Sequence, residues 1–133
     1  MQTRGEETRA EILAVLARSR APMSAYAILD VLKRGRQKLT PPTIYRALAS
    51  LVAQGRVHRL ESLNAFVACQ CGEHHDDMIL SICDACGRVE ESLAPDVMSR
   101  LSRIAGKSGF VPERHVIELR GRCAACATAE TRA

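Results

Sequence analysis

Aromatic residues are scarce in this chain of 133 residues, which contains no Trp, two Tyr and two Phe. Its core must therefore be built mainly from Leu, Ile, Val and Ala. No apolar run approaches the ~20 residues that a membrane-spanning helix needs. The N-terminal run MQTRGEETRAEILAVL does not match a signal peptide, because acidic residues interrupt it before any apolar stretch. We expect a cytoplasmic protein with no membrane segment, in which the six cysteines are metal ligands rather than disulfides.

The charged residues are divided unevenly between the two halves of the chain. Residues 1–60 hold eleven Lys and Arg but four Asp and Glu, a net charge of +7, whereas residues 61–133 have a net charge of −3. A basic first half suits a polyanionic partner such as DNA. A slightly basic, solvated surface explains the charge equally well, so the motifs have to decide.

Two helices are predicted in the first part of the chain by apolar positions that recur every three or four residues. In TRAEILAVLARS, Thr8 and Glu11 have the spacing of a capping box at a helix start. In MSAYAILDVLKRG, Ser24 is a suitable N-cap and Gly35 is placed to end the helix.

A third helix is predicted over LTPPTIYRALASLVAQG. Thr40 is a good N-cap, Pro41 suits the first helical position, and Gly55 suits the left-handed residue after the end. The apolar stripe of this helix consists of Ile44, Leu48, Leu51 and Val52.

The stripe leaves a more polar surface facing outward, made of Thr43, Arg46, Ala47 and Ser50, with Tyr45 at its margin. Such a surface is typical of a recognition helix. The first turns of a recognition helix enter the major groove, and an Arg there can bond both acceptors of a guanine edge.

The run RVHRLESLNAFVAC predicts a two-stranded hairpin, because apolar residues alternate on both sides of ESLN. The alternating residues are Val57, Leu60, Ala65 and Val67. Three helices followed by such a hairpin form a winged helix-turn-helix. A small helical bundle without a DNA role is the alternative, but an outward Arg46 on a segment of charge +7 favours DNA binding.

The second half predicts a small strand–strand–helix–strand unit. MILSICDACGRVEES is typical of two strands around a tight turn at Gly87, LAPDVMSRLSRIAGKSGF of an amphipathic helix, and RHVIELRGRCAAC of a further strand. One face of the helix carries Val97, Leu101, Ile104 and Ala105. A metal ion or a partner chain would help a unit of this size to hold together.

Two Cys-x-x-Cys pairs lie at the two ends of this unit. Two residues between cysteines let both sulfurs point at one ion, and four thiolates suit a tetrahedral Zn²⁺. Separate redox dithiols or unpaired buried cysteines are the alternative, but paired spacings in a cytosolic chain favour zinc. A site closed by four cysteines has no open position, so it is structural and not catalytic. The predicted ligands are Cys83, Cys86, Cys123 and Cys126.

Further residues able to bind a metal lie on the hairpin, between the two halves and in the second half. Mixed ligands drawn from two domains and their hinge can form a site in only one arrangement of the domains, so that metal binding shifts the population between arrangements. Any single one of these residues could equally be a solvated surface group. The residues are His58, Cys69, Cys71, His74, His75, Asp76, Asp77, Glu90, Glu91 and His115.

The runs PPTIYRALASLVAQGRVHRLE, HHDD, CDACG and CAAC resemble the ferric uptake regulator (Fur) family of bacterial metal-responsive repressors. RVHRLESLNAFVAC resembles the zinc uptake regulator branch of that family. The resemblance covers about residues 8–127. It implies an α+β homodimer with a winged helix-turn-helix DNA-binding domain at residues 1–69, a hinge at 70–77, and a small α/β dimerisation domain at 78–133 that carries the four-cysteine zinc.

The resemblance also implies a sensor zinc site. Its ligands carry over to a hairpin pair, a strand carboxylate and a hinge histidine, namely His58, Cys69, Glu91 and His75. Either His74 or Asp76 could take the place of His75. In addition, His115 matches a ligand of a further site in iron-sensing members of the family.

The implied function is a zinc-responsive repressor of zinc-uptake genes, with at least two zinc ions per chain, that binds a palindromic DNA operator as a dimer. The DNA contacts carry over to Tyr26, Thr43, Tyr45 and Arg46. The nearest alternative is a regulator of the same family that senses iron, manganese, nickel or peroxide, and the soft thiolate of Cys69 favours zinc. An enzyme is not expected, because no His-Glu-x-x-His motif is present and a recognition helix would be unexplained.

Overall fold

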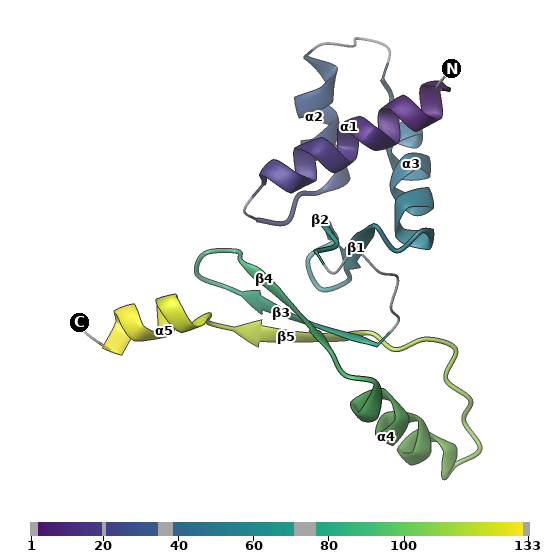
Figure 1. Ribbon diagram of the computed structural model, residues 1–133, viewed down its shortest axis with the longest axis vertical. Coiled ribbons are helices and arrows are strands. Elements are labelled where there is room, and N and C mark those ends of the chain that lie inside the picture. The colour runs from purple at the N-terminus through teal and green to yellow at the C-terminus, as the bar shows by residue number, and fades with distance from the viewer. Residues whose placement is uncertain (1–2, 20, 35–38, 71–76, 132–133) are drawn as a thin grey trace. The chain divides into compact units, whose positions relative to one another are not determined.

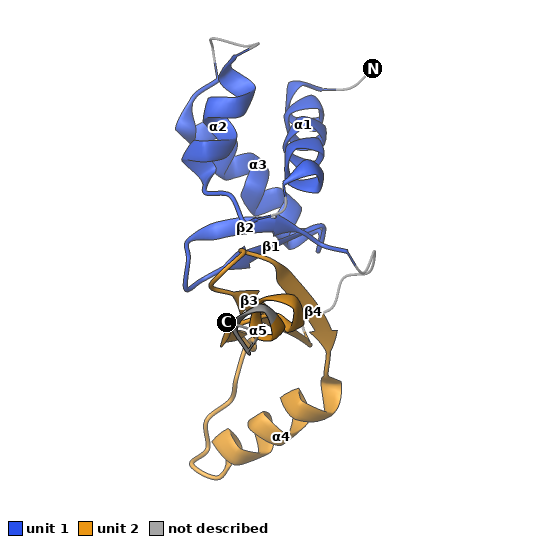
Figure 2. Ribbon diagram, turned by 90° about the vertical axis from the view of Figure 1, so that its left-hand side faces the viewer, with its two compact units in different colours: residues 1–74 blue, residues 75–133 orange. Residues whose placement is uncertain are grey.

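The computed structural model describes residues 3–19, 21–34, 39–70 and 77–131. The chain divides into two compact units, Met1–His74 and His75–Ala133, which are blue and orange in Figure 2. Cys71, His74, His75 and Asp76, all in the predicted hinge, lie outside the described residues. Within the described residues, no helix has the length and apolar character needed to cross a membrane.

The first unit contains three helices followed by a hairpin, the order that the sequence predicts (Figure 1). The two strands of the hairpin are antiparallel, and His58 lies opposite Val67. The elements are α1 (Arg4–Arg18), α2 (Ala25–Lys33), α3 (Pro41–Ala53), β1 (Val57–Leu60) and β2 (Ala65–Ala68).

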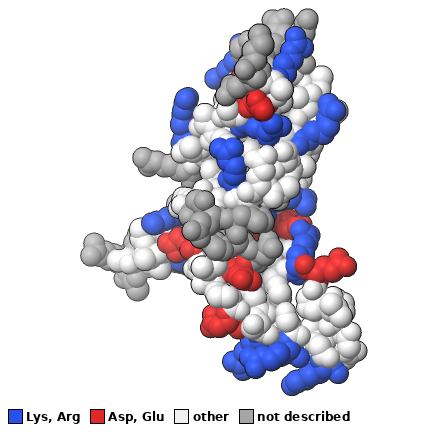
Figure 3. Space-filling model, turned by 45° about the vertical axis from the view of Figure 1, so that its right-hand side comes forward, with Lys and Arg blue, Asp and Glu red and all other residues white. Residues whose placement is uncertain are grey.

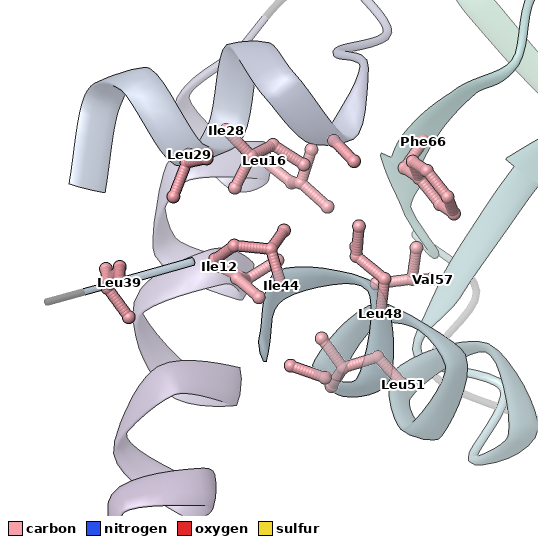
Figure 4. Packing of buried hydrophobic residues seen from close by; sticks show 12 residues of the cluster. Ile12, Leu16, Ile28, Leu29, Leu39, Ile44, Leu48, Leu51, Val57 and Phe66 are labelled. Carbon is pink, nitrogen blue, oxygen red and sulfur yellow. The ribbon is translucent and has the colours of Figure 1, made fainter. Parts of the chain in front are cut away.

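One hydrophobic core joins these five elements. Each helix contributes a fully buried isoleucine, and Figure 4 shows that their side chains point toward a common centre. The hairpin closes the core with Val57 and Phe66. The three isoleucines are Ile12, Ile28 and Ile44. Because α3 is packed on its apolar stripe, the opposite side of the helix is left for other contacts.

The start of α1 differs from the prediction. The capping box uses Thr3 and Glu6 instead of Thr8 and Glu11, so the helix begins five residues earlier than the Thr8 cap would allow. Thr8 is buried, and its hydroxyl donates a hydrogen bond to the carbonyl oxygen of Arg4 at 2.8 Å. The sequence contains the same Thr-x-x-Glu spacing twice, and Thr8 lies one turn before the buried Ile12 on the same face of the helix.

The other helix ends mostly follow the sequence. Ser24 caps α2 by accepting the backbone N–H of Ala27 at 3.1 Å, and Gly55 has the predicted left-handed conformation, with φ of 72°. Thr40 is the N-cap of α3, but its hydroxyl lies 3.1 Å from the hydroxyl of Thr43 and caps no backbone group. The predicted stop of α2 at Gly35 lies outside the described residues.

The second unit is a three-stranded sheet with two helices. The strand order is β4-β3-β5, in which β3 is antiparallel to β4 and parallel to β5. The final helix was not predicted. The elements are β3 (Met78–Cys83), β4 (Val89–Leu93), α4 (Pro95–Gly106), β5 (Ile117–Gly121) and α5 (Ala124–Thr131).

The second unit buries few side chains, and many large apolar ones are exposed. Among its described residues, the buried ones are Leu80, Ile82, Cys83 and Met98. The predicted apolar face of α4 is present, but Val97, Leu101 and Ile104 on it remain 37%, 39% and 54% exposed. Leu93, Phe110, Val111, Val116 and Leu119 are exposed as well. The described residues of a single copy therefore form no closed core in this unit.

Candidate metal centres and nucleic-acid interface

The four cysteines predicted to bind a structural metal lie together in the second unit. Cys83 ends β3, and Cys123 stands directly before α5. The parallel pairing of β3 with β5 sets Cys83 opposite Gly121, and this register brings the two cysteine pairs to the same end of the sheet. All four sulfur atoms lie within 4.8 Å of one another.

Backbone hydrogen bonds shape the turn that holds the first cysteine pair. The N–H of Cys83 donates to the carbonyl oxygen of Arg88 at 2.8 Å, and the N–H of Gly87 donates to that of Cys83 at 2.9 Å. Gly87 has φ of 80°, a left-handed conformation that glycine adopts without strain, as predicted for the tight turn at this position. The N–H of Cys86 donates to the sulfur of Cys83 at 3.4 Å. The turn therefore keeps the sulfur atoms of Cys83 and Cys86 close together.

The sulfur cluster has the dimensions of a tetrahedral zinc site. Four thiolates at ~2.3 Å from a central ion are separated by about 3.8 Å along each edge of the tetrahedron, and the sulfurs of Cys86 and Cys123 lie 3.8 Å apart. The residues present therefore fit a divalent cation that prefers four sulfur ligands.

The pKa values of the cysteine thiols in the cluster also fit a bound cation. Hydrogen bonds from the backbone N–H groups of Cys123 and Cys86 lower the pKa of Cys83 to about 6. Side-chain hydrogen bonds with Cys123, Cys83 and Cys86 raise the pKa of Cys126 to about 12. Without a cation, crowded sulfurs have to share protons, and a bound zinc ion would take the place of those protons.

A second pair of metal-binding residues lies on the hairpin of the first unit. His58 is on β1, and the N–H of Cys69, just after β2, donates to the carbonyl oxygen of Arg56 at 2.9 Å. Since His58 lies opposite Val67, Cys69 is its diagonal neighbour on the same face of the ladder. Their ligand atoms lie within 4.8 Å of each other. Both side chains are half-buried.

Two further predicted ligands, Glu91 and His115, lie in the second unit. Glu91 lies on β4 of the second unit, opposite Leu80, and is half-buried. His115 lies before β5, and its Nε2 atom is 2.9 Å from the hydroxyl of Ser102 on α4. Among the described residues, no cluster of metal-binding side chains includes His115.

The predicted DNA-binding residues lie on the solvent side of α2 and α3. Tyr26 and Tyr45 are 60% and 43% exposed, and their rings form an edge-to-face pair with centroids 6.4 Å apart. Arg46 is exposed and Thr43 half-buried. The prediction that Ala47 faces outward is wrong, because Ala47 is 7% exposed and belongs to the core. It lies one turn after Ile44, and its small side chain widens the apolar stripe.

A groove of about 950 Å³ lies between α1 and the first half of α3. Thr43, Ala47 and Arg46 line it from α3, while Arg4 and Arg9 line it from α1, together with Glu7 and Glu11. Neither α1 arginine was among the predicted DNA contacts; Arg4 precedes the predicted start of the helix at Thr8, whereas Arg9 lies within the predicted helix. On the face drawn in Figure 3, Lys and Arg side chains are spread over the first unit.

Comparisons with known proteins agree with this architecture. The profile of the ferric uptake regulator family matches residues 1–120. The chain is 40% identical over 124 residues to the zinc uptake regulation protein of Escherichia coli (strain K12), covering 92% of this chain and 72% of that protein. It is 31% identical over 121 residues to the ferric uptake regulation protein of Legionella pneumophila, covering 89% and 87%.

Among solved structures, a zinc uptake regulator complexed with zinc and DNA matches with a TM-score of 0.86 and 38% identity. That match covers 93% of this chain and 83% of the other. The predicted fold class is therefore confirmed, with an N-terminal DNA-binding domain of winged helix-turn-helix type and a small C-terminal α/β domain. The chain belongs to the ferric uptake regulator family.

Proposed function

We propose that this chain is a zinc-responsive repressor that binds a palindromic operator of zinc-uptake genes as a homodimer. The observation that carries the proposal is the His58–Cys69 pair on the wing of a winged helix, with ligand atoms within 4.8 Å. A metal site on the wing can link metal binding to the placement of the DNA-binding unit. The 40% identity to a zinc uptake regulation protein supports zinc as the metal.

In this proposal, α3 is the helix that recognises the DNA sequence. Arg46 is exposed near the N-terminal end of the helix, where its guanidinium can bond the O6 and N7 atoms of a guanine in the major groove. Thr43 and the Tyr26–Tyr45 pair border the same surface and would contact neighbouring bases or phosphates. The net charge of +7 on residues 1–60 would attract the DNA backbone.

Dimerisation belongs to residues 78–133. The exposed apolar side chains of α4 and β5, among them Leu101, Ile104 and Leu119, need a cover that one copy does not supply. A second copy supplies an identical apolar face, as in most symmetric dimers. Two winged helices held by one dimer would then match the two halves of a palindrome.

Each chain would hold at least two zinc ions with different tasks. Cys83, Cys86, Cys123 and Cys126 would hold a closed structural zinc that stabilises the small second unit. His58 and Cys69 would hold the sensor zinc together with Glu91 and His75. Either His74 or Asp76 could take the place of His75 as the fourth ligand. The thiolate of Cys69 favours zinc over iron(II) or manganese(II).

The sensor zinc would act by population shift. Its ligands come from the wing, from the hinge at residues 70–77 and from β4 of the second unit, so a bound ion favours one arrangement of the two units. That arrangement would present both recognition helices to the operator. The coupling is reciprocal, so operator DNA should also tighten the binding of the sensor zinc.

Binding to a zinc-uptake promoter fragment tests this proposal. Fluorescence anisotropy at fixed salt would be measured in buffered zinc, iron(II) and manganese(II), with the structural zinc checked by elemental analysis. Tight binding at free zinc levels far below those needed for iron or manganese is expected. An equal response to iron(II) or manganese(II) would assign the chain to another branch of the family, and binding that ignores all metals would exclude a metal sensor.

A further inference from the structure

An ion pair connects the two arms of the four-cysteine cluster. The guanidinium of Arg120 donates two hydrogen bonds to the Oδ1 atom of Asp84, from Nε at 2.9 Å and from Nη2 at 2.7 Å. The two side chains are about half exposed. The backbone N–H of Asp84 also donates to the carbonyl oxygen of Gly121 at 2.8 Å. Asp84 is therefore joined to β5 twice, through its side chain to Arg120 and through its backbone to Gly121.

Asp84 and Arg120 are each close in the sequence to one of the two cysteine pairs. Asp84 directly follows Cys83 in the first cysteine turn, and Arg120 lies on β5, three residues before Cys123. The ladder between β3 and β5 ends at the pairing of Cys83 with Gly121. Beyond that point the two cysteine pairs depend on local contacts to stay at liganding distance from each other.

We propose that Arg120 is a positioning residue for the structural zinc, which holds the two cysteine pairs together through Asp84 and slows the loss of the ion. This inference rests on the proposed role of the four cysteines as a zinc site. Zinc leaves a closed four-sulfur site when thiolates detach in succession, and one cysteine pair has to swing away from the other. A bond between the two arms opposes that opening and favours recapture of the ion.

The geometry requires an arginine at this position. Two N–H groups of one planar guanidinium converge on a single carboxylate oxygen, whereas a lysine ammonium is a point charge on a flexible stem. Arg88 provides a comparison within the same region. It pairs with Glu90 at 3.7 Å, and this pair joins neighbouring residues at the start of β4 without linking the two cysteine arms.

The test measures how fast the structural zinc passes to an excess of a colorimetric chelator, using the full chain after removal of the more labile sensor zinc. Arg120→Ala and Asp84→Ala should each release zinc up to about fivefold faster than the parent protein, the upper range for an exposed ion pair. Arg120→Lys should recover little of the loss. The double variant should be no faster than either single variant, and the Arg88→Ala control should match the parent.

Cobalt(II) gives a second readout that a general loss of stability would not move. Cobalt in place of zinc reports the tetrahedral geometry through its visible d–d bands, and Arg120→Ala should alter these bands while Arg88→Ala leaves them unchanged. If the parent protein holds no zinc by elemental analysis, the proposed structural site itself fails. If the parent holds zinc, and Arg120→Ala releases it at the parental rate or adds fully to Asp84→Ala, the positioning role is excluded.

Discussion

The two candidate metal centres differ in how their ligands are brought together. The four cysteines belong to one unit, and the pairing of β3 with β5 brings both cysteine pairs to the same end of its sheet. The hairpin of the other unit supplies one histidine and one cysteine, which is half of a tetrahedral set. A complete site formed within one unit suits a permanent structural ion. A half-site that needs ligands from elsewhere can respond to the concentration of zinc.

Removal of one structural ligand should have the largest effect. Cys123→Ser would leave three thiolates, and structural zinc sites contribute about 10–16 kcal/mol of binding energy that is also folding energy. We expect loss of zinc, loss of ordered structure in the second unit and loss of the dimer. Elemental analysis, circular dichroism and gel filtration measure these three changes. A folded, dimeric variant without zinc would show that the cluster does not stabilise the fold.

A charge on the exposed face of α4 should separate dimerisation from metal binding. Leu101→Glu would place a carboxylate in the proposed interface between copies, where an unpaired buried charge is costly. We expect a monomer that keeps its structural zinc, as measured by light scattering after gel filtration. Arg100→Glu, on the same helix, is the control for added negative charge. A dimer as stable as the parent would place the interface elsewhere.

Loss of the guanidinium on α3 should weaken operator binding without changing the dimer. Arg46→Ala removes a bidentate contact to a guanine, and such contacts contribute about 1–3 kcal/mol of discrimination. Operator affinity should fall about 5- to 150-fold while nonspecific DNA is affected less. Arg18→Ala, at the far end of α1, is a matched control. Anisotropy titrations with operator and scrambled DNA measure both affinities, and equal losses on the two DNAs would reduce Arg46 to a phosphate contact.

The smallest predicted effect concerns the aromatic pair beside Arg46. The edge-to-face contact of Tyr26 and Tyr45 should orient both rings toward DNA, and such pairs contribute about 0.5–1.5 kcal/mol. Alanine at either position should therefore weaken operator binding, and the double variant should lose less than the sum of the two. A strictly additive double-mutant cycle would show that the two rings act independently.

The sequence predicts best where local spacing determines the structure. The apolar stripe of α3, the left-handed Gly55 and the cysteine turn with Gly87 each follow from residues a few positions apart. These local signals were enough to place Arg46 on the exposed side of α3 and His58 on a hairpin strand, whereas the meeting of the two cysteine pairs depends on the register of β3 and β5.

The errors come from competition between equal signals and from contacts between distant residues. Two Thr-x-x-Glu motifs compete for the start of α1, and the spacing alone does not choose between them. Phe66 is more deeply buried than the expected Val67, because its side chain joins the core of the first unit. Its backbone also pairs with Met23, a bridge that hairpin alternation does not reveal. The Arg120–Asp84 pair depends on the register of two strands that are far apart in the sequence.

The proposal that the four-cysteine site is structural and the hairpin site is the sensor is tested most directly by operator affinity. It would be measured as a function of buffered free zinc, for the parent protein and for Cys69→Ser. Both proteins would first be shown to hold the structural zinc. We predict that zinc tightens operator binding by the parent about 5- to 150-fold, the usual range of allosteric coupling, and leaves binding by Cys69→Ser unchanged. A full zinc response in Cys69→Ser would contradict the assignment of the hairpin as the sensor.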